Sequence, residues 1–183
     1  MLLPRLSTIL VLCLCLDDYV HAWSMYLSDA NRIGSNNLPE VTERIDLIYP
    51  GTLWCGSGSK TSNPNELGTY NETDACCRDH DMCPDVIEAF HSKHGLTNTA
   101  FYTRLDCACD EKFYDCLSKS EDGIGRKIGY IYFTRLGTRC FRKDYPIVEC
   151  KRETGIFMKT CLEYELDTSQ PKEYQWFDVP PFD

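Results

Sequence analysis

The chain has 183 residues, a length that suits one domain or at most two. Its 28 acidic side chains outnumber its 19 basic ones, and the formal net charge is −9. This charge argues against nucleic acid as a partner and against strong electrostatic attraction to anionic membranes. No stretch is long and apolar enough to cross a bilayer, so no transmembrane segment is predicted.

Residues 1–22 have the pattern of a signal peptide. Arg5 precedes a short apolar run, and Val20-His21-Ala22 offers small residues at the spacing that signal peptidase requires. Residues 23–44 lack cysteine and hydrophobic periodicity, which predicts a pro-segment or flexible arm. The folded domain is therefore expected at 45–183, in a secreted, extracellular protein.

The cysteine count fits export. Two of the 12 cysteines, Cys13 and Cys15, lie in the signal peptide, which leaves ten. An even number in an oxidising compartment predicts five disulfides. Spacing alone does not fix which cysteines pair.

Two helices are predicted in the first half of this domain, after a loop. Residues 49–68 are rich in Gly, Ser, Asn and Pro and predict a loop. The next segment, Thr73 to Cys83, predicts a helix that Thr73 or Asp74 caps and Pro84 ends. Apolar residues at the spacing of one helix face predict a second helix over 99–119, with Thr97 or Asn98 as its cap.

The second half predicts strands. Residues 129–133 are aromatic and β-branched, which favours a strand. Short strands and turns are expected over 140–183, with 174–177 as one strand. The expected fold class is a small, disulfide-rich α+β domain. It has two long antiparallel disulfide-linked helices, an N-terminal calcium loop and a small β-rich C-terminal part.

The sequence places an imidazole and a carboxylate side by side at His80 and Asp81. A further carboxylate, Asp110, follows Cys109 on the second predicted helix, and disulfides between the helices would bring it to His80. A carboxylate beside a histidine fixes its tautomer and stabilises the imidazolium once a proton is accepted. Because no Gly-x-Ser-x-Gly motif occurs, water is the expected nucleophile.

The glycine-rich segment 54–59 allows three interpretations. A phosphate-binding P-loop fails because Ser59, not glycine, precedes Lys60. A plain glycine turn and a cage of backbone carbonyls both remain. Ca²⁺ accepts such carbonyls together with a carboxylate, and Asp81 is the candidate.

Zinc is a rival interpretation of the cysteines around His80. The four candidate ligands are Cys76, Cys77, His80 and Cys83. An even cysteine count in a secreted chain weighs against zinc.

Three motifs carry a resemblance to a known family. They are Tyr49-Pro50-Gly51-Thr52-Leu53-Trp54-Cys55-Gly56, Asp74-Ala75-Cys76-Cys77-Arg78-Asp79-His80-Asp81-Met82-Cys83 and Cys107-Ala108-Cys109-Asp110. Together they resemble a secreted phospholipase A2 of the bee-venom (group III) type, over about residues 48–177. The resemblance implies an enzyme, with 45–183 as its catalytic domain. That enzyme would be a calcium-dependent carboxylic ester hydrolase that cleaves the sn-2 ester of glycerophospholipids.

The resemblance also implies roles for individual residues. His80 is the general base, Asp110 its partner and Tyr132 the tyrosine that helps to hold Asp110. The implied Ca²⁺ ligands are Asp81 and the carbonyls of Trp54, Gly56 and Gly58. The implied bridges are Cys55–Cys77, Cys76–Cys116, Cys83–Cys109, Cys107–Cys140 and Cys150–Cys161.

The expected partner is the surface of a phospholipid membrane or micelle, bound peripherally by a monomer. An apolar rim should seal the enzyme against lipid, and the candidates are Ile48, Tyr49, Leu53, Phe90 and Phe101. The sequon at Asn71 predicts N-glycosylation. The alternative function is a venom toxin or secreted binding protein that acts mainly through membrane or receptor contact.

Overall fold

The computed structural model describes residues 47–155 and 159–182. The predicted signal peptide and pro-segment lie outside the described residues. Within the described part of the chain, no helix has the length and apolar character needed to cross a membrane.

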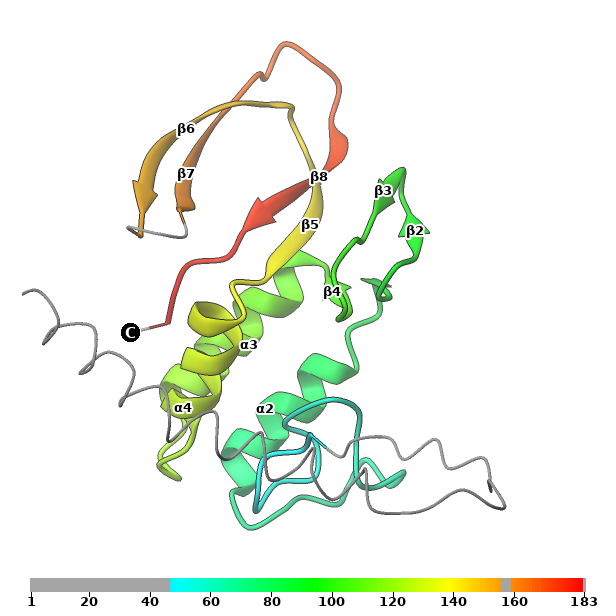
Figure 1. The fold of residues 1–183 in the computed structure, drawn as a ribbon, viewed down its shortest axis with the longest axis vertical. Helices are drawn as coiled ribbons and strands as arrows, with labels where there is room; N and C mark the ends of the chain where they lie inside the picture. Colours follow the sequence, from blue (N-terminus) through cyan, green and yellow to red (C-terminus); the bar gives the residue numbers. More distant parts are fainter. Residues whose placement is uncertain (1–46, 156–158, 183) are drawn as a thin grey trace, which may run out of the picture. The chain divides into compact units, whose positions relative to one another are not determined.

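Along the described chain, α2 is followed by four short strands, then by the remaining helical elements and then by four longer strands (Figure 1). The helical elements are α2 (Asn71–Asp81), α3 (Cys107–Lys119), α4 (Gly125–Gly129) and the π-helix η1 (Tyr130–Arg135). The strands are β1 (Val86–Ile87), β2 (Ser92–Lys93), β3 (Leu96–Thr97), β4 (Arg104–Leu105), β5 (Arg139–Asp144), β6 (Ile147–Thr154), β7 (Thr160–Leu166) and β8 (Glu173–Asp178). The fold is therefore a small α+β domain.

The first predicted helix is present as α2, but neither predicted cap holds its start. Tyr70 precedes the helix and makes no side-chain capping bond. The backbone N–H of Thr73 instead donates to the carboxylate of Asp122, at 2.8 Å, from a segment 49 residues away. At the other end, the N–H of Cys83 donates to the carbonyl of His80, and Pro84 follows.

The second predicted helix begins later than expected. It starts at Cys107 as α3, where the Asp106 side chain accepts a hydrogen bond from the N–H of Ala108, at 2.8 Å. Asn98 is fully buried and its amide donates to the carbonyls of Ile87, Glu88 and Tyr102, so it ties together the segments before α3 rather than capping a helix. The segment before α3 pairs as β4 with β1.

The strand predicted over 129–133 was wrong, because these residues are helical at the junction of α4 and η1. Ile128 and Phe133 are buried on one side, and a Cβ at Gly129 would lie 2.7 Å from the ring of Phe182. A short aromatic run suits a buried helix as well as a strand, and packing decides between them.

The strands form separate antiparallel pairs. Strand β5 pairs with β8, so the strand predicted over 174–177 is confirmed. Strands β6 and β7 form a two-stranded ribbon. The C-terminal part is therefore rich in β-structure, as expected.

Five disulfides tie these elements together. They are Cys55–Cys77, Cys76–Cys116, Cys83–Cys109, Cys107–Cys140 and Cys150–Cys161, the same pairs that the family resemblance implies. Cys76–Cys116 joins the middle of α2 to the end of α3, and Cys83–Cys109 joins the segment just after α2 to the beginning of α3. The pair of helices is thereby locked in one register.

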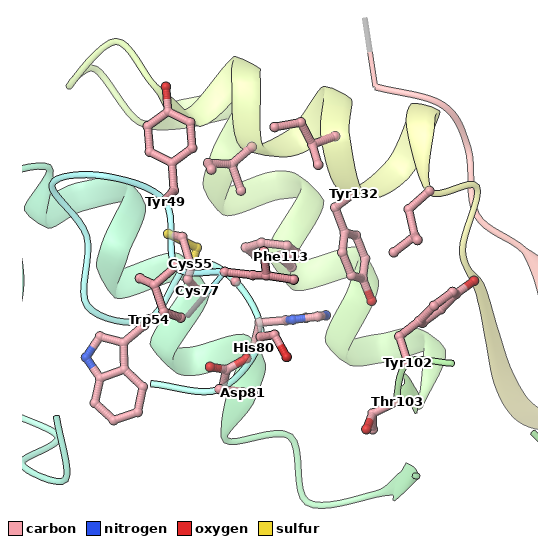
Figure 2. A pocket seen from close by; sticks show the side chains of 18 of the residues that line it. Tyr49, Trp54, Cys55, Cys77, His80, Asp81, Tyr102, Thr103, Phe113 and Tyr132 are labelled. Carbon is pink, nitrogen blue, oxygen red and sulfur yellow. A yellow bond between two sulfur atoms is a disulfide. The ribbon is translucent and has the colours of Figure 1, made fainter. Parts of the chain in front are cut away.

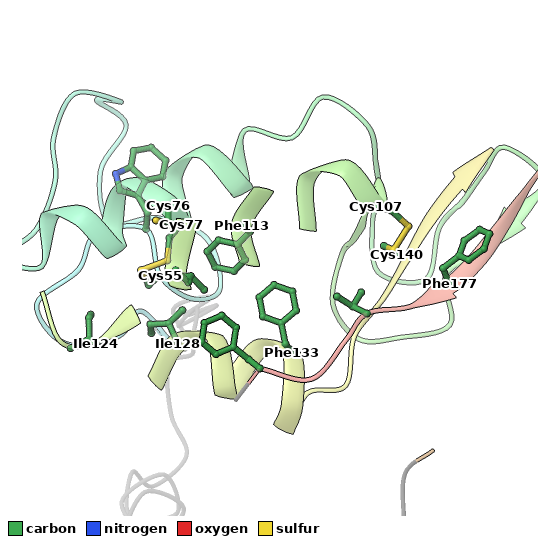
Figure 3. Packing of buried hydrophobic residues seen from close by; sticks show 14 residues of the cluster. Cys55, Cys76, Cys77, Cys107, Phe113, Ile124, Ile128, Phe133, Cys140 and Phe177 are labelled. Atoms are coloured by element: carbon green, nitrogen blue, oxygen red, sulfur yellow. A yellow bond between two sulfur atoms is a disulfide. The ribbon is translucent and has the colours of Figure 1, made fainter. Parts of the chain in front are cut away.

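The core lies where the helices meet the start of β5 and the end of β8 (Figure 3). Phe113 and Leu117 enter it from α3, Phe133 from η1 and Phe177 from β8. The Cys107–Cys140 bridge lies in the same cluster and anchors α3 to β5. This packing gives α2 and α3 a rigid base for the side chains on their facing sides.

Candidate active site

His80 and Asp110 form a buried pair between α2 and α3. The Nε2 atom of His80 lies 2.8 Å from Oδ1 of Asp110. His80 is 9% exposed and Asp110 is fully buried. Because the carboxylate accepts the hydrogen bond, the proton of a neutral His80 sits on Nε2 and Nδ1 keeps its lone pair.

Aromatic side chains surround this pair. The hydroxyl of Tyr132 donates to the same oxygen of Asp110, at 3.0 Å. The ring of Phe113 stacks on His80 with centroids 4.2 Å apart, and Tyr132 meets the imidazole edge-on. Burial and then the charge of Asp110 raise the pKa of Tyr132, so the phenol stays protonated and able to donate. The imidazole is thus held from two sides.

The pair opens onto a cleft of about 930 Å³ (Figure 2). His80, Asp81 and Tyr132 line it together with Trp54, and Figure 2 shows Asp81 beside the His80 ring. The cleft wall is mostly apolar, with few polar groups near the imidazole. Such a cleft suits an acyl chain and one reactive polar centre.

Asp81 presents a carboxylate that has no side-chain hydrogen bond among the described residues. The residue is exposed as a whole and lines the cleft, yet enough protein surrounds its carboxyl to remove part of its hydration. This burial, followed by repulsion from Asp74, raises the pKa of Asp81 to about 7. A cation at the carboxylate would offset both effects.

The predicted carbonyl ligands lie along the same cleft. Trp54, Gly56 and Gly58 line it with Asp81. A Cβ on Gly56 would collide with the backbone of Leu47 and Ile48, so only glycine allows this close approach. Backbone carbonyls with one carboxylate form the oxygen-only donor set that Ca²⁺ prefers, and the residues present fit that ion.

The zinc interpretation lacks ligands. Cys76, Cys77 and Cys83 are all in disulfides. Within residues 47–155 and 159–182, no group of three or more His, Cys, Asp or Glu side chains is arranged to hold a metal.

Two residues at the site were not found by sequence reasoning. Phe113, which stacks on His80, was recognised only as part of an apolar helix face. Asp74 was assigned to helix capping, yet its carboxylate accepts hydrogen bonds from the loop at Leu53, Trp54 and Gly68. No local signal in the sequence separates this use of Asp74 from a cap, because its partners lie up to 21 residues away.

The apolar rim differs from the predicted one. Ile48 is buried, so it was wrong as a rim residue, whereas Tyr49 and Leu53 are half-buried and pack partly against the core. Phe90 and Phe101 are exposed, as proposed. Among the exposed large apolar side chains, Leu47, Phe101 and Ile131 line the cleft.

Comparisons with known proteins agree with this geometry. A family model described as phospholipase A2 matches residues 48–144. A phospholipase A2 of Xylocopa appendiculata circumvolans is 53% identical over 173 residues, which cover 94% of this chain and 91% of the relative. One of Bombus pensylvanicus is 61% identical over 134 residues (73% and 98%), and one of Apis mellifera is 53% identical over 160 residues (87% and 89%).

Proposed function

This chain belongs to the phospholipase A2 family and hydrolyses phospholipids, and we propose on that premise that it cleaves their sn-2 ester with the help of Ca²⁺. The products would be a fatty acid and a lysophospholipid. The observation that supports this assignment best is the hydrogen bond between His80 and Asp110 at the wall of a largely apolar cleft.

His80 acts as the general base in this proposal. Its Nδ1 atom takes a proton from a water molecule, and that water attacks the sn-2 carbonyl carbon. Asp110 keeps the imidazole in the tautomer that can accept this proton and stabilises the imidazolium that forms. His80 then returns the proton to the leaving alkoxide of the lysophospholipid.

Asp81 and the carbonyls of Trp54, Gly56 and Gly58 would hold the calcium ion. When bound, Ca²⁺ supplies polarisation of the ester carbonyl and a positive charge for the lipid phosphate. Phe113 and the apolar wall keep bulk water away from the imidazole, which strengthens its hydrogen bond to Asp110.

The setting we propose is extracellular. Residues 1–22 would be removed as a signal peptide and 23–44 as a pro-segment, which leaves 45–183 as the mature catalytic domain. Asn71 is exposed at the first residue of α2, which supports its proposed glycosylation. The monomer would bind membrane or micelle surfaces peripherally.

Turnover on mixed-chain phosphatidylcholine vesicles tests the proposal. With a different acyl chain at each position, mass spectrometry of the released fatty acid identifies the bond that is cleaved. We expect release of the sn-2 chain only, loss of activity in excess chelator, and recovery with Ca²⁺ but not Mg²⁺, which demands tighter octahedral geometry.

Two outcomes would contradict parts of this proposal. Full activity in chelator would exclude the calcium role, and release of the sn-1 chain would exclude the regiochemistry. The alternative function, a toxin or secreted binding protein that acts through contact alone, requires vesicle binding without turnover.

A further inference from the structure

Asp74 is a buried carboxylate that binds the loop rather than its own helix. It is fully buried. Its Oδ2 accepts hydrogen bonds from the N–H groups of Leu53, at 2.9 Å, and Gly68, at 2.8 Å, while Oδ1 accepts from Trp54, at 2.8 Å. Three backbone donors on one buried carboxylate are charge-assisted bonds, stronger than ordinary ones.

Helix α2 holds three consecutive loop residues from one of its faces. Asp74 binds Leu53 and Trp54, and Cys77, one turn later, is bridged to Cys55. Asp81 lies a further turn along the same face, because positions i, i+3 and i+7 of a helix align. One rigid helix therefore sets where the loop lies relative to Asp81.

The loop is fixed just where carbonyl oxygens are needed. The Leu53–Trp54 peptide is bound through its N–H to Asp74, and the carbonyl of Trp54 accepts a further bond from the N–H of Gly56, at 3.0 Å. Cys55 is held in addition through its carbonyl, which accepts from Tyr49 at 2.8 Å. Rotation of the peptides at 53–56 would break these bonds.

We propose that Asp74 is a positioning residue for calcium: it places the carbonyls of the 53–58 loop at the correct distance from Asp81. The inference rests on the proposed calcium function. Affinity for Ca²⁺ depends on the rigidity of its ligands, so loss of this anchor should weaken ion binding before it unfolds the protein.

Calcium titration by calorimetry on the substrate-free protein tests this. Asp74→Asn keeps the size of the side chain but replaces Oδ2 with an amide NH₂, so Gly68 loses its acceptor and Leu53 loses one of the two oxygens to which it donates. We expect calcium binding at least tenfold weaker than in the wild type. Equal affinity would overturn the proposal.

Asp122→Asn is the matched control. Asp122 also binds the first turn of α2, through the N–H and hydroxyl of Thr73, but its hydrogen bonds do not reach the loop. We expect it to lower thermal stability and leave calcium affinity unchanged. If both variants lost affinity equally, the effect would belong to the helix and the assignment to Asp74 would fail.

Asp74→Glu separates charge from position. It keeps the negative charge but moves the carboxylate by the length of one methylene, so it should also bind calcium weakly. Wild-type affinity in this variant would show that only the charge matters, and would overturn a positioning role.

Hydrogen exchange on the calcium-free wild type requires no variant. The amides of Leu53, Trp54 and Gly68 should be protected, whereas those of the exposed loop residues Ser57 and Ser59 should exchange rapidly. Rapid exchange at all five positions would overturn the proposal. Absence of calcium binding by the wild type would instead overturn the proposed function on which it rests.

Discussion

At the level of single residues, His80 has its two ring nitrogens in different roles. Nε2 is bound to Asp110 and is buried, while the ring stacks on Phe113. Only Nδ1 is left to exchange a proton with a molecule in the cleft. The position of the ring is therefore set by Asp110 and Phe113, neither of which exchanges a proton with a molecule in the cleft.

Replacing His80 with glutamine should remove the base without removing the fold. Glutamine is similar in size and polar, and no disulfide or backbone bond depends on the imidazole. Because positioned general bases contribute about 10²–10⁴-fold to rate, turnover should fall by at least that range. The measurement is initial rate on vesicles, with far-UV circular dichroism to confirm folding. Near wild-type turnover in a folded variant would require another base.

Tyr132→Phe should have a milder effect than the loss of His80. It deletes one donor to Oδ1 of Asp110 but keeps the ring that packs against His80. Hydrogen bonds to charged groups contribute about 1.5–3 kcal/mol, so unfolding by denaturant should show a loss of that order. Activity should persist, since the bond between His80 and Asp110 remains. Activity as low as that of His80→Gln would mean that Tyr132 acts in the chemistry itself.

At the level of elements, the start of α2 depends on Asp122, a residue in the loop that follows the end of α3. Burial alone would raise the pKa of Asp122, but hydrogen bonds from Thr73 outweigh it and leave the pKa below the ordinary 3.8. A carboxyl whose pKa is lowered by folding stabilises the fold above its unfolded-state pKa. That contribution is lost as the pH falls through the lower pKa of the folded protein.

Asp122→Asn should therefore destabilise the protein in a pH-dependent manner. At pH 7 the free energy of unfolding should fall by about 0.5–2 kcal/mol, the usual range for loss of a helix cap. The difference from the wild type should begin to shrink below pH 3.8, where Asp122 of the unfolded chain becomes protonated, and should vanish as the pH falls through the lower pKa of the folded protein. Urea unfolding at pH 7 and pH 3 measures both values. A difference that did not depend on pH would show that charge on Asp122 is irrelevant.

The sequence predicted those elements whose signals are local. Proline at 84 marked the end of α2, and residues 174–177 were expected as a strand where β8 lies, so both were found. The start of α3 was missed because Asn98, a good capping residue, is used to hold a loop. Residues 129–133 were assigned to a strand because they are aromatic and β-branched, and the packing of Gly129 and Phe133 against Phe182, far along the chain, leaves no local signal.

The sequence predicted more of the candidate site than of the fold that surrounds it. His80, Asp81 and Asp110 each stand beside cysteines, and the bridges between α2 and α3 bring the two halves together. The contribution of Asp74 could not be predicted, since it depends on the path of a loop without regular structure. Family resemblance supplied the role of Tyr132, although its local structure was assigned incorrectly.

At the level of the whole molecule, exposed apolar residues surround the mouth of the cleft. Phe101 is 75% exposed and Ile131 is 51% exposed, and both line the cleft. They come from segments 30 residues apart, so no single stretch of sequence marks them as a surface. An acidic chain needs such apolar contacts to bind lipid, because charge offers little attraction.

The double variant Phe101→Ser and Ile131→Ser should weaken binding to zwitterionic vesicles by at least about tenfold. Fully burying one such side chain contributes about 1.5–3 kcal/mol, and 1.4 kcal/mol corresponds to tenfold. Val148→Ser is the control, since Val148 is 60% exposed on β6 and does not line the cleft. Vesicle sedimentation at low and moderate salt measures both, and wild-type binding should change little with salt. If vesicle binding of the wild type fell steeply with salt, and the double variant bound vesicles as well as the wild type does, a basic patch would make the contact instead.

Helix α2 also limits how this protein can change in length during evolution. Asp74, Cys77 and His80 each meet a different partner and Asp81 lines the cleft, and one inserted residue would turn everything beyond it by about 100° around the axis. The ribbon of β6 and β7 does not line the cleft. Across relatives, insertions and deletions are therefore expected to accumulate in the ribbon and to be absent between Asp74 and Asp81.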